Sequence, residues 1–421
     1  MMKLDIAAYC GREIACGCGQ THFCAIRDVT VKRGALAELP RLTAGYKKVF
    51  VVADNNTFPI CGERVLALTK AAGYHAFTRE GHLVPDEDAV AELKAALPEG
   101  VDLLLGIGSG VINDTCKYVA WDLGIDSAIV GTAPSMDGYA SSGAAMITAG
   151  MKVTYTRKPP VFIVGDVEIL KNAPLDMIRA GYGDIVGKYS SLCDWRLAAL
   201  MNGEYFCKPT YDLVMAVTDE IRDSAEKIVA REDDAIELLM NALVLIGVTL
   251  SLVGSTRPGS GSEHHLSHFF EIVGLVRNEP HFVHGTDVAY SFVVTAAMRE
   301  KIRAMARPVF HTEDREAREA AWRRIYGPIY EEIASLQREA GSYDRDMRDD
   351  YARKWPEVVE ILNECPTAEE CRAMLVRAGY DLDDFEKMYG AEKIHDAMLY
   401  AKDLKNRYSV LWLYYLLFSG E

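Results

Sequence analysis

The sequence Val101-Asp-Leu-Leu-Leu-Gly-Ile-Gly-Ser-Gly110 joins an apolar run to three closely spaced glycines, and a helical pattern follows over 111–122. The run predicts a strand that ends in a tight turn before a helix. Glycines let the backbone approach a phosphate closely, and the helix N-terminus offers free N–H groups at its positive end. The pattern is not G-x-G-x-x-G, because position 111 is Val, and no Lys-Ser/Thr follows Gly110 as in a Walker A loop. A pyrophosphate cradle and a plain structural turn both fit it.

The flanking sequence repeats this alternation of strand and helix. Helical patterns cover 63–73 and 86–97, and further strands are predicted at 28–32, 48–53, 74–78 and 127–130. Strands that alternate with helices predict an open parallel sheet with helices on both faces. Ligands of such sheets bind at the carboxyl ends of the strands.

From about Pro174 the strand patterns fade, and long helical patterns continue to the C-terminus. Two of them, 313–339 and 345–362, are highly charged and predict solvated helices. We therefore predict an α/β domain over 1–173 and an all-helical domain over 174–421.

Composition restricts the class of protein. The 421 residues include 46 basic and 61 acidic side chains, a net charge of −15, which argues against a nucleic-acid-coating function. No export signal is recognisable in Met1–Tyr9, so the ten scattered cysteines are expected to be reduced thiols in the cytoplasm. The apolar stretches 238–254 and 410–418 are shorter than the roughly 20 residues of a membrane span, and we expect buried helices there and no membrane partner.

Histidines gather in the predicted helical half. Half of the ten histidines lie within 264–284: His264, His265, His268, His281 and His284. His264 and His268 are four residues apart, so they share one face of a helix that is expected to begin near Gly259. This density favours a metal site over satisfied core histidines, but spacing alone leaves the choice of ligands open.

A second candidate metal site is Cys16-x-Cys18-x-x-x-His22-x-Cys24, with Cys10 upstream. It could form a structural zinc knuckle. The sequence has no C-x-x-C pair that would supply a second pair of zinc ligands. The alternative is therefore an irregular segment that leads into the first strand.

Three polar segments lie where a ligand of the sheet would bind. Thr132-Ala-Pro-Ser135 and Asp137-Gly138 follow a predicted strand. Asp54, at the end of another strand, could accept hydrogen bonds from a ribose or form a turn with Asn55-Asn56. Gly181-Tyr-Gly-Asp184 is expected at the start of a helix that contains Lys188.

Taken together, and in this order, the motifs resemble the glycerol-1-phosphate dehydrogenase family. This family belongs to the superfamily of metal-dependent alcohol dehydrogenases, glycerol dehydrogenase and dehydroquinate synthase. Ser255-Thr-Arg-Pro-Gly-Ser-Gly-Ser-Glu-His-His265 and the Cys16-to-Gly19 lead-in are similar to its bacterial branch. The resemblance covers about residues 10–300 and rests also on Gly106 to Gly110 with Asp114 and Lys117, Thr132 to Gly138, Gly181 to Asp184, and His284-Gly285.

The resemblance implies a fold and site residues. The fold is a Rossmann-like domain and a helical domain with the active site in the cleft between them. The implied metal ligands are Asp184, His264 and His284, and the implied catalytic residues are Asp184 and His268. Substrate would be lined by Asp137, Asp184 and His268. The nicotinamide dinucleotide would be bound by Gly108, Ser109, Gly110, Val111, Ile112, Thr132, Ala133, Pro134, Ser135 and Ser141. Asp54 is a further cofactor-binding candidate, from its place at the end of a strand and not from the resemblance.

The phosphate loop departs from the family pattern. Ser109 stands where the family usually has the middle glycine, and Val111 and Asn113 also differ from the common residues. A serine fits there if its φ is negative.

The activity implied by the resemblance is the reversible, NAD(P)H-dependent reduction of dihydroxyacetone phosphate to sn-glycerol 1-phosphate. A divalent ion, nickel or zinc before iron, would polarise the carbonyl, and His268 or a metal-linked water would supply the proton. Lys158, Lys188 and Arg257 are candidate cations for the substrate phosphate. A homodimer or larger homo-oligomer is expected.

Other functions stay open on the same sequence. A glycerol dehydrogenase acting on an unphosphorylated polyol would share the metal arrangement. A non-enzymatic nucleotide or metal sensor is the second alternative, since fold alone does not give function. A cyclising lyase resembling dehydroquinate synthase fits less well, because its Asn-x-Gly-His-x-x-Gly-His phrase is absent.

Overall fold

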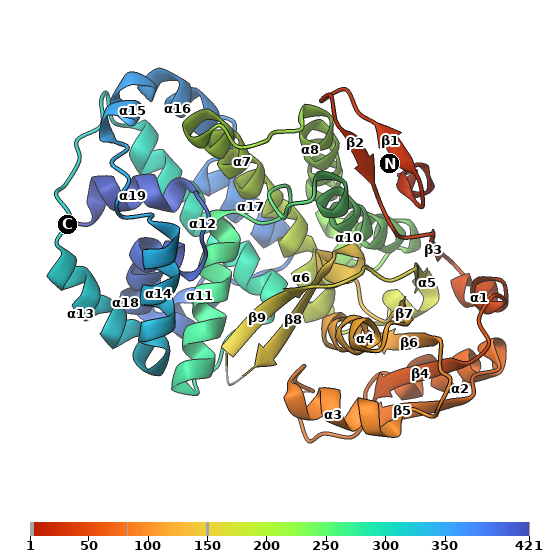
Figure 1. The fold of residues 1–421 in the computed structure, drawn as a ribbon. Helices are drawn as coiled ribbons and strands as arrows, with labels where there is room; N and C mark the ends of the chain where they lie inside the picture. The colour runs from red at the N-terminus through yellow and green to blue at the C-terminus, as the bar shows by residue number, and fades with distance from the viewer. Residues whose placement is uncertain (1–3, 82, 149–150, 421) are drawn as a thin grey trace. The chain divides into compact units, whose positions relative to one another are not determined.

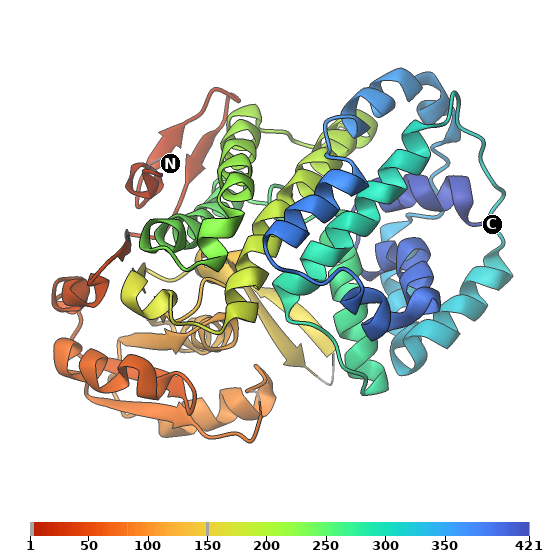
Figure 2. The same ribbon diagram turned by 180° about the vertical axis from the view of Figure 1, so that it is seen from behind.

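A computed structural model describes residues 4–81, 83–148 and 151–420 (Figure 1; Figure 2 from behind). Met1, Met2 and Lys3, the start of the N-terminal segment considered above, lie outside the described residues. The chain forms two compact units. The first consists of Met1–Ile185 and Asp219–Ser255, and the second of Val186–Thr218 and Thr256–Glu421.

The first unit is built on a six-stranded, all-parallel sheet in the order β3-β10-β7-β6-β4-β5. The alternation read from the sequence therefore gives the predicted parallel sheet, and β10 adds a strand that was not predicted. From β4 the chain continues to β5, toward one edge of the sheet. From β6 it continues to β7, toward the opposite edge, so the strand order reverses between β4 and β6. The strands are β3 (Asp28–Lys32), β4 (Val49–Asp54), β5 (Gly73–Phe77), β6 (Leu103–Gly108), β7 (Asp126–Gly131) and β10 (Phe162–Asp166).

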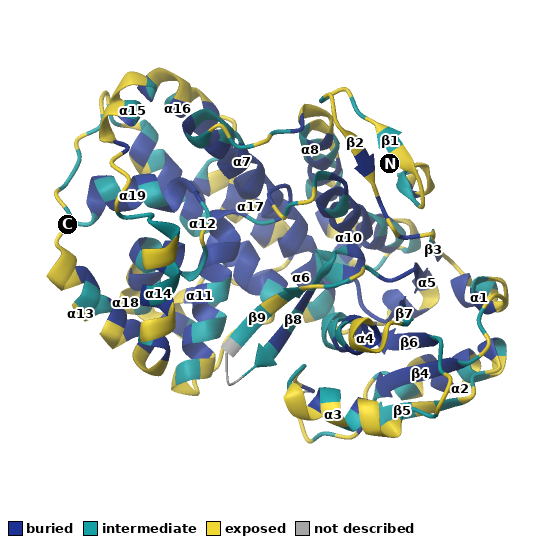
Figure 3. Cartoon of the chain, in the orientation of Figure 1, coloured by how far each residue is buried: buried dark blue, intermediate teal, exposed yellow. Residues whose placement is uncertain are grey.

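Helices cover both faces of this sheet. On one face, Val51 and Leu105 share a buried cluster with Cys61 and Val65 of α2 (Phe58–Thr69). The other face is covered by α4 (Gly110–Leu123) and α10 (Asp233–Val253). Figure 3 shows the central strands β4, β6 and β7 buried. The other helices that begin before residue 186 are η1 (Ile6–Tyr9), η2 (Ala35–Glu38), α1 (Leu39–Thr43), α3 (Glu87–Ala96), η3 (Asp137–Ala140), α5 (Val167–Leu170) and α6 (Leu175–Val186).

Two antiparallel hairpins complete the first unit. β1 (Glu13–Ala15) pairs with β2 (Thr21–Phe23), and β8 (Gly143–Thr148) pairs with β9 (Met151–Thr156). Neither hairpin was predicted, because strands of this kind give too short or too weak an alternation to stand out.

The division into units differs from the predicted boundary at 173/174. Helix α10 comes late in the chain but packs on the sheet: a Cβ added at Gly131 would lie 3.0 Å, and one at Gly165 3.2 Å, from the side chain of Met240. An almost wholly apolar helix must bury its whole circumference, and the open face of the sheet provides that surface. Among the described helices, α10 is the one long and apolar enough to cross a membrane, and 72% of its most apolar window is buried inside the protein. The buried helix predicted over 238–254 is confirmed.

The second unit is helical. The single helix expected over 313–339 is wrong: it breaks at Gly327-Pro328 into α13 and α14, because proline lacks the amide hydrogen that a continuing helix needs. The pattern over 345–362 likewise divides into two helices. The C-terminal helix 410–418 is confirmed residue for residue as α19 and is largely buried.

The elements after the sheet have the following bounds. The chain passes back from the second unit to the first within α8 (Lys208–Asp223), and α9 (Ala225–Val229) precedes α10. The helices of the second unit are α7 (Lys188–Asn202), α11 (Ser262–Arg277), α12 (His284–Arg303), α13 (Arg315–Tyr326), η4 (Gly327–Ile329), α14 (Tyr330–Ala340), α15 (Arg348–Arg353), α16 (Trp355–Leu362), α17 (Ala368–Arg377), α18 (Asp384–Tyr400), η5 (Ala401–Leu404) and α19 (Val410–Phe418).

Candidate active site

The glycine-rich turn lies at the carboxyl end of β6, beside the point where the strand order reverses. Gly108 is required by packing, because a Cβ there would lie 2.7 Å from Ile112 of α4. Ser109 directly precedes this helix with φ −117°, so the condition set for a serine at this position is met. The half-buried residues Ser109, Gly110 and Val111 thus present the first N–H groups of α4 at the ligand-binding edge of the sheet.

Side chains of α4 hold the segment that follows β7. Asn113 donates from Nδ2 to the carbonyl of Gly138 at 3.2 Å, and Asp114 accepts from the amide of Ala145 at 3.0 Å. Lys117 is buried, pairs with Asp114 at 2.8 Å and donates to the carbonyl of Gly143. The glycine-rich turn and the segment that contains η3 are therefore fixed by one helix.

The predicted segment Thr132–Ser135 is buried next to this turn. The amide of Thr132 donates to the carbonyl of Gly108 at 3.0 Å. Ser141, half-buried, donates its hydroxyl to the carbonyl of Gly138 at 3.2 Å. The structure thus brings together the predicted cofactor residues of β6, α4 and the segment after β7.

Asp54 forms the turn that was one of its two predicted roles. Its Oδ1 accepts from the amides of Asn56 and Thr57 at 2.9 and 2.7 Å, which closes the turn between β4 and α2. The residue stands at the carboxyl end of β4, the strand next to β6. The turn does not test the predicted contact with a ribose.

The position expected for Gly181-Tyr-Gly-Asp184 is wrong. It lies in the second half of α6, and Lys188 begins a separate helix, α7. The reason is packing: a Cβ at Gly181 would lie 1.9 Å from the carbonyl oxygen of Pro134. Glycine at position 181 therefore lets α6 lie close to the segment after β7. It does not form a turn before a helix.

This close approach sets the environment of Asp184. Its side chain is fully buried, and its Oδ2 accepts from the amide of Asp137 at 2.8 Å. Asp137 and Asp184, both predicted to line the substrate, are therefore adjacent within the first unit.

Three of the five clustered histidines converge in the second unit. The ring centroids of His264 and His284 lie 5.1 Å apart, and that of His268 lies 6.0 and 5.4 Å from them. A ring nitrogen of His264 and one of His284 lie within 4.8 Å of each other. The helix N-termini of α11 and α12 carry these two residues, which explains why residues 20 apart in sequence meet.

His265 and His281 do not join them. The Nδ1 of His265 contacts the carbonyl of Gly261 at 2.8 Å, and burial lowers the pKa of this imidazole well below its ordinary value. It is a core histidine kept neutral. His281 is exposed, with Nδ1 at 2.9 Å from the carbonyl of Phe282.

The converging histidines are oriented through their Nδ1 atoms. Oε1 of Glu263 lies 2.7 Å from Nδ1 of His264, and the hydroxyl of Ser267 lies 3.3 Å from Nδ1 of His284. Burial raises the pKa of Glu263, while the amide of Gly261 donates to its carboxylate at 2.8 Å. Glu263 was not predicted as a site residue, although an acidic residue directly before a candidate ligand was the available signal.

The loop before α11 is anchored by buried cations. Arg257 donates from two nitrogens to Glu204, at 2.8 and 2.6 Å, and to the carbonyl of Tyr408. Lys188 is fully buried and donates to the carbonyl of Gly259 at 2.8 Å. Two of the three candidate phosphate-binding cations are thus engaged in shaping this loop, and Lys158 is the exposed one.

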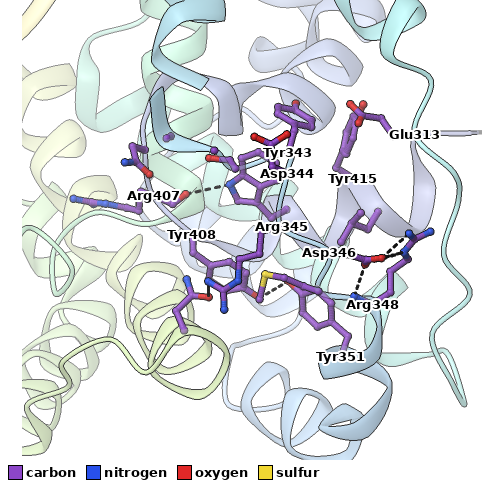
Figure 4. Close-up of a pocket in the computed structure, with 18 of the residues that line it drawn as sticks. Glu313, Tyr343, Asp344, Arg345, Asp346, Arg348, Tyr351, Arg407, Tyr408 and Tyr415 are labelled. Atoms are coloured by element: carbon purple, nitrogen blue, oxygen red, sulfur yellow. Dashed lines mark hydrogen bonds and ion pairs between the residues drawn. The ribbon is translucent and has the colours of Figure 1, made fainter. Parts of the chain in front are cut away.

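A pocket of about 380 Å³ lies elsewhere in the second unit (Figure 4). Its wall carries Tyr343, Tyr351 and Arg407, and Asp346 is joined to Arg348 at its rim. Arg407 also donates to the carbonyl of Ser260 at 2.8 Å, in the loop before α11. None of the converging histidines lines this pocket, which the sequence did not predict.

Known proteins resemble both the sequence and the fold. A family model described as iron-containing alcohol dehydrogenase matches residues 30–174. The chain is 32% identical over 376 residues to glycerol-1-phosphate dehydrogenase (NAD(P)+) of Bacillus licheniformis, covering 82% of this chain and 93% of that protein. A protein of the same name from Geobacillus thermodenitrificans is 30% identical over 86% of this chain and 85% of its own length.

Solved structures share the architecture. An alcohol dehydrogenase from Oenococcus oeni superposes with a TM-score of 0.61 at 15% identity, covering 94% of this chain and 98% of that one. A probable glycerol dehydrogenase from Sinorhizobium meliloti gives 0.54 at 20% identity, over 86% and 98%. At these identities the likeness shows the fold alone.

Proposed function

Because this chain belongs to the glycerol-1-phosphate dehydrogenase family, we propose that it interconverts dihydroxyacetone phosphate and sn-glycerol 1-phosphate with an NAD(P) cofactor and a divalent metal. The main support for this activity is the 32% sequence identity to a relative of that name, 93% of which is covered by the match. The order of the motifs along the sequence and the convergence of His264 with His284 support the same activity.

We assign one metal ion to Asp184, His264 and His284. The donor set fits: Glu263 and Ser267 contact Nδ1 of the two histidines, so Nε2 of each would be the atom that holds the ion. One carboxylate and two imidazoles suit nickel, zinc or iron(II), and we favour nickel or zinc. When bound, the ion supplies Lewis-acid polarisation of the substrate carbonyl.

The residues of the first unit would hold the dinucleotide. The N–H groups at Ser109 to Ile112 would receive the pyrophosphate at the positive end of α4. Thr132, Ala133, Pro134, Ser135 and Ser141 would line the remainder, and Asp54 the adenosine ribose.

We assign His268 as proton donor to the alkoxide that hydride transfer creates. It is half-buried, beside both His264 and His284. Asp137 lies against Asp184 and would hydrogen-bond the substrate hydroxyl. Lys158 is our assignment for the substrate phosphate, because Arg257 and Lys188 are engaged in the loop before α11.

The first experiment is NADH oxidation by chelated protein with dihydroxyacetone phosphate, dihydroxyacetone or no ketone. Nickel, zinc or iron(II) is then restored in separate assays. We expect oxidation only with the phosphorylated ketone and only after metal is returned, and the most effective ion identifies the metal. Oxidation with dihydroxyacetone alone would replace the proposal by a glycerol dehydrogenase, and inactivity with every ion would contradict it.

Replacing Glu263 with Gln is expected to weaken metal binding about 10- to 100-fold. The amide keeps an acceptor near Nδ1 of His264 but removes the charge that makes this imidazole a better ligand. Competition with a chromophoric chelator measures the change. Glu271→Gln, on the same helix, is the matched control and should bind metal as the parent does; equal affinity in both variants would contradict the assigned role of Glu263.

A further inference from the structure

The turn of the β1–β2 hairpin carries a second group of metal-ligating side chains. The sulfurs of Cys16 and Cys18 and a ring nitrogen of His22 all lie within 4.8 Å of one another. Cys18 Sγ and His22 Nε2 are 3.4 Å apart. Cys24, the fourth member of the pattern in the sequence, is not one of the side chains that converge here.

The backbone of the turn gathers these three side chains. The amide of Cys16 donates to the carbonyl of Gln20 at 3.0 Å, and the amide of Gly19 donates to the carbonyl of Cys16 at 3.0 Å. Gly19 has φ +85°, a conformation that glycine adopts without strain. The turn therefore closes tightly and returns the chain so that His22 on β2 lies next to the thiols.

The separations match those of a zinc site. Zinc bonds of about 2.3 Å to sulfur and 2.0–2.1 Å to nitrogen, at tetrahedral angles, set sulfur and nitrogen about 3.6 Å apart. The observed 3.4 Å is close to that value.

The hairpin also lacks an apolar core of its own. Each strand has three residues, and the buried one among the six is His22, while Phe23 is 54% exposed. A two-stranded hairpin of this size is marginal in water without a further constraint. A bound ion would supply that constraint, as it does in small zinc-stabilised units.

We propose that Cys16, Cys18 and His22 bind a structural zinc ion, distinct from the ion assigned to Asp184, His264 and His284. Two thiolates and an imidazole are soft ligands that favour zinc, whereas the carboxylate-containing set also accepts nickel or iron(II). Both cysteines lose a proton on binding. A structural site takes four ligands, so one more comes from outside the hairpin.

The test compares metal content in four full-length proteins: the parent, Cys16→Ser/Cys18→Ser, Cys10→Ser and Asp184→Asn. All are purified with zinc and analysed by mass spectrometry of the metal. We expect the double variant to lose one zinc per chain and to keep dehydrogenase activity. Cys10→Ser, which changes a neighbouring thiol, should keep the full metal content, and Asp184→Asn should keep the hairpin zinc.

Cobalt(II) in the parent protein provides a second measurement that does not depend on how a variant folds. Thiolate ligation gives a sulfur-to-cobalt charge-transfer band in the near ultraviolet, and we expect this band. Its absence from the cobalt-loaded parent, or an unchanged zinc content in the double variant, would overturn the proposal. Neither result bears on the dehydrogenase assay, so the two proposals fail separately.

Discussion

Replacing Asp184 with Asn reduces turnover about 10³-fold or more and leaves NADH binding close to that of the parent protein. Loss of the carboxylate removes the one anionic ligand assigned to the ion, and Lewis-acid stabilisation of a developing alkoxide is worth several kcal/mol. Asparagine retains an oxygen that can accept from the amide of Asp137, so the local fold should persist. Steady-state assays, bound-metal analysis and NADH fluorescence measure the three quantities.

The matched control is Asp176→Asn, an exposed carboxylate on the same helix, α6. It should leave turnover, metal content and NADH binding unchanged. An Asp184→Asn protein with full turnover would contradict the metal assignment. Loss of NADH binding in that variant would instead mean that Asp184 is needed for the folding of the first unit.

Replacing Gly181 with Ala is expected to lower the free energy of unfolding by about 3 kcal/mol. The added methyl group would meet the carbonyl oxygen of Pro134 at 1.9 Å, and that oxygen belongs to backbone that cannot turn aside. Helix α6 must therefore shift away from the segment after β7, and Asp184 moves with it. Urea unfolding followed by circular dichroism measures the loss of stability.

Gly45→Ala is the control for the intrinsic effect of the substitution. No atom lies within 4 Å of a Cβ built at Gly45, and its φ is not positive, so a change of less than about 1 kcal/mol is expected. Equal unfolding free energies for the two variants would show that α6 tolerates the clash. The Gly181→Ala protein should also lose dehydrogenase activity at temperatures where it stays folded, because its carboxylate is displaced.

The sheet was predictable because its signals are local. The strand predicted over 101–105 is found as β6 over Leu103–Gly108, and its apolar run, the glycines and the helix after them lie within one short stretch. The placement of α10 was not predictable, because its sequence requires burial but does not say against which surface. The same limit applies to Gly181, whose role depends on a carbonyl 47 residues earlier, that of Pro134.

The candidate site shows a similar division. Helical spacing predicted that His264 and His268 share a face, and their rings do lie near each other. Spacing could not separate His264 from His265, which follows it and points into the core. His284 was preferred to His281 as a metal ligand only because of the family resemblance. His284 begins a second helix, α12, and the packing that brings this residue to His264 has no local signal in the sequence.

The anchoring of the loop before α11 ties the histidine cluster to the end of the chain. Arg257 contacts Glu204 and the carbonyl of Tyr408, and Arg407 holds the carbonyl of Ser260. An expression fragment that stops after the last recognisable motif, near residue 300, would keep the Arg257–Glu204 pair but lose the contacts that Tyr408 and Arg407 make with this loop. The C-terminal residues carry no catalytic signature, yet a minimal catalytic fragment of this enzyme must retain them.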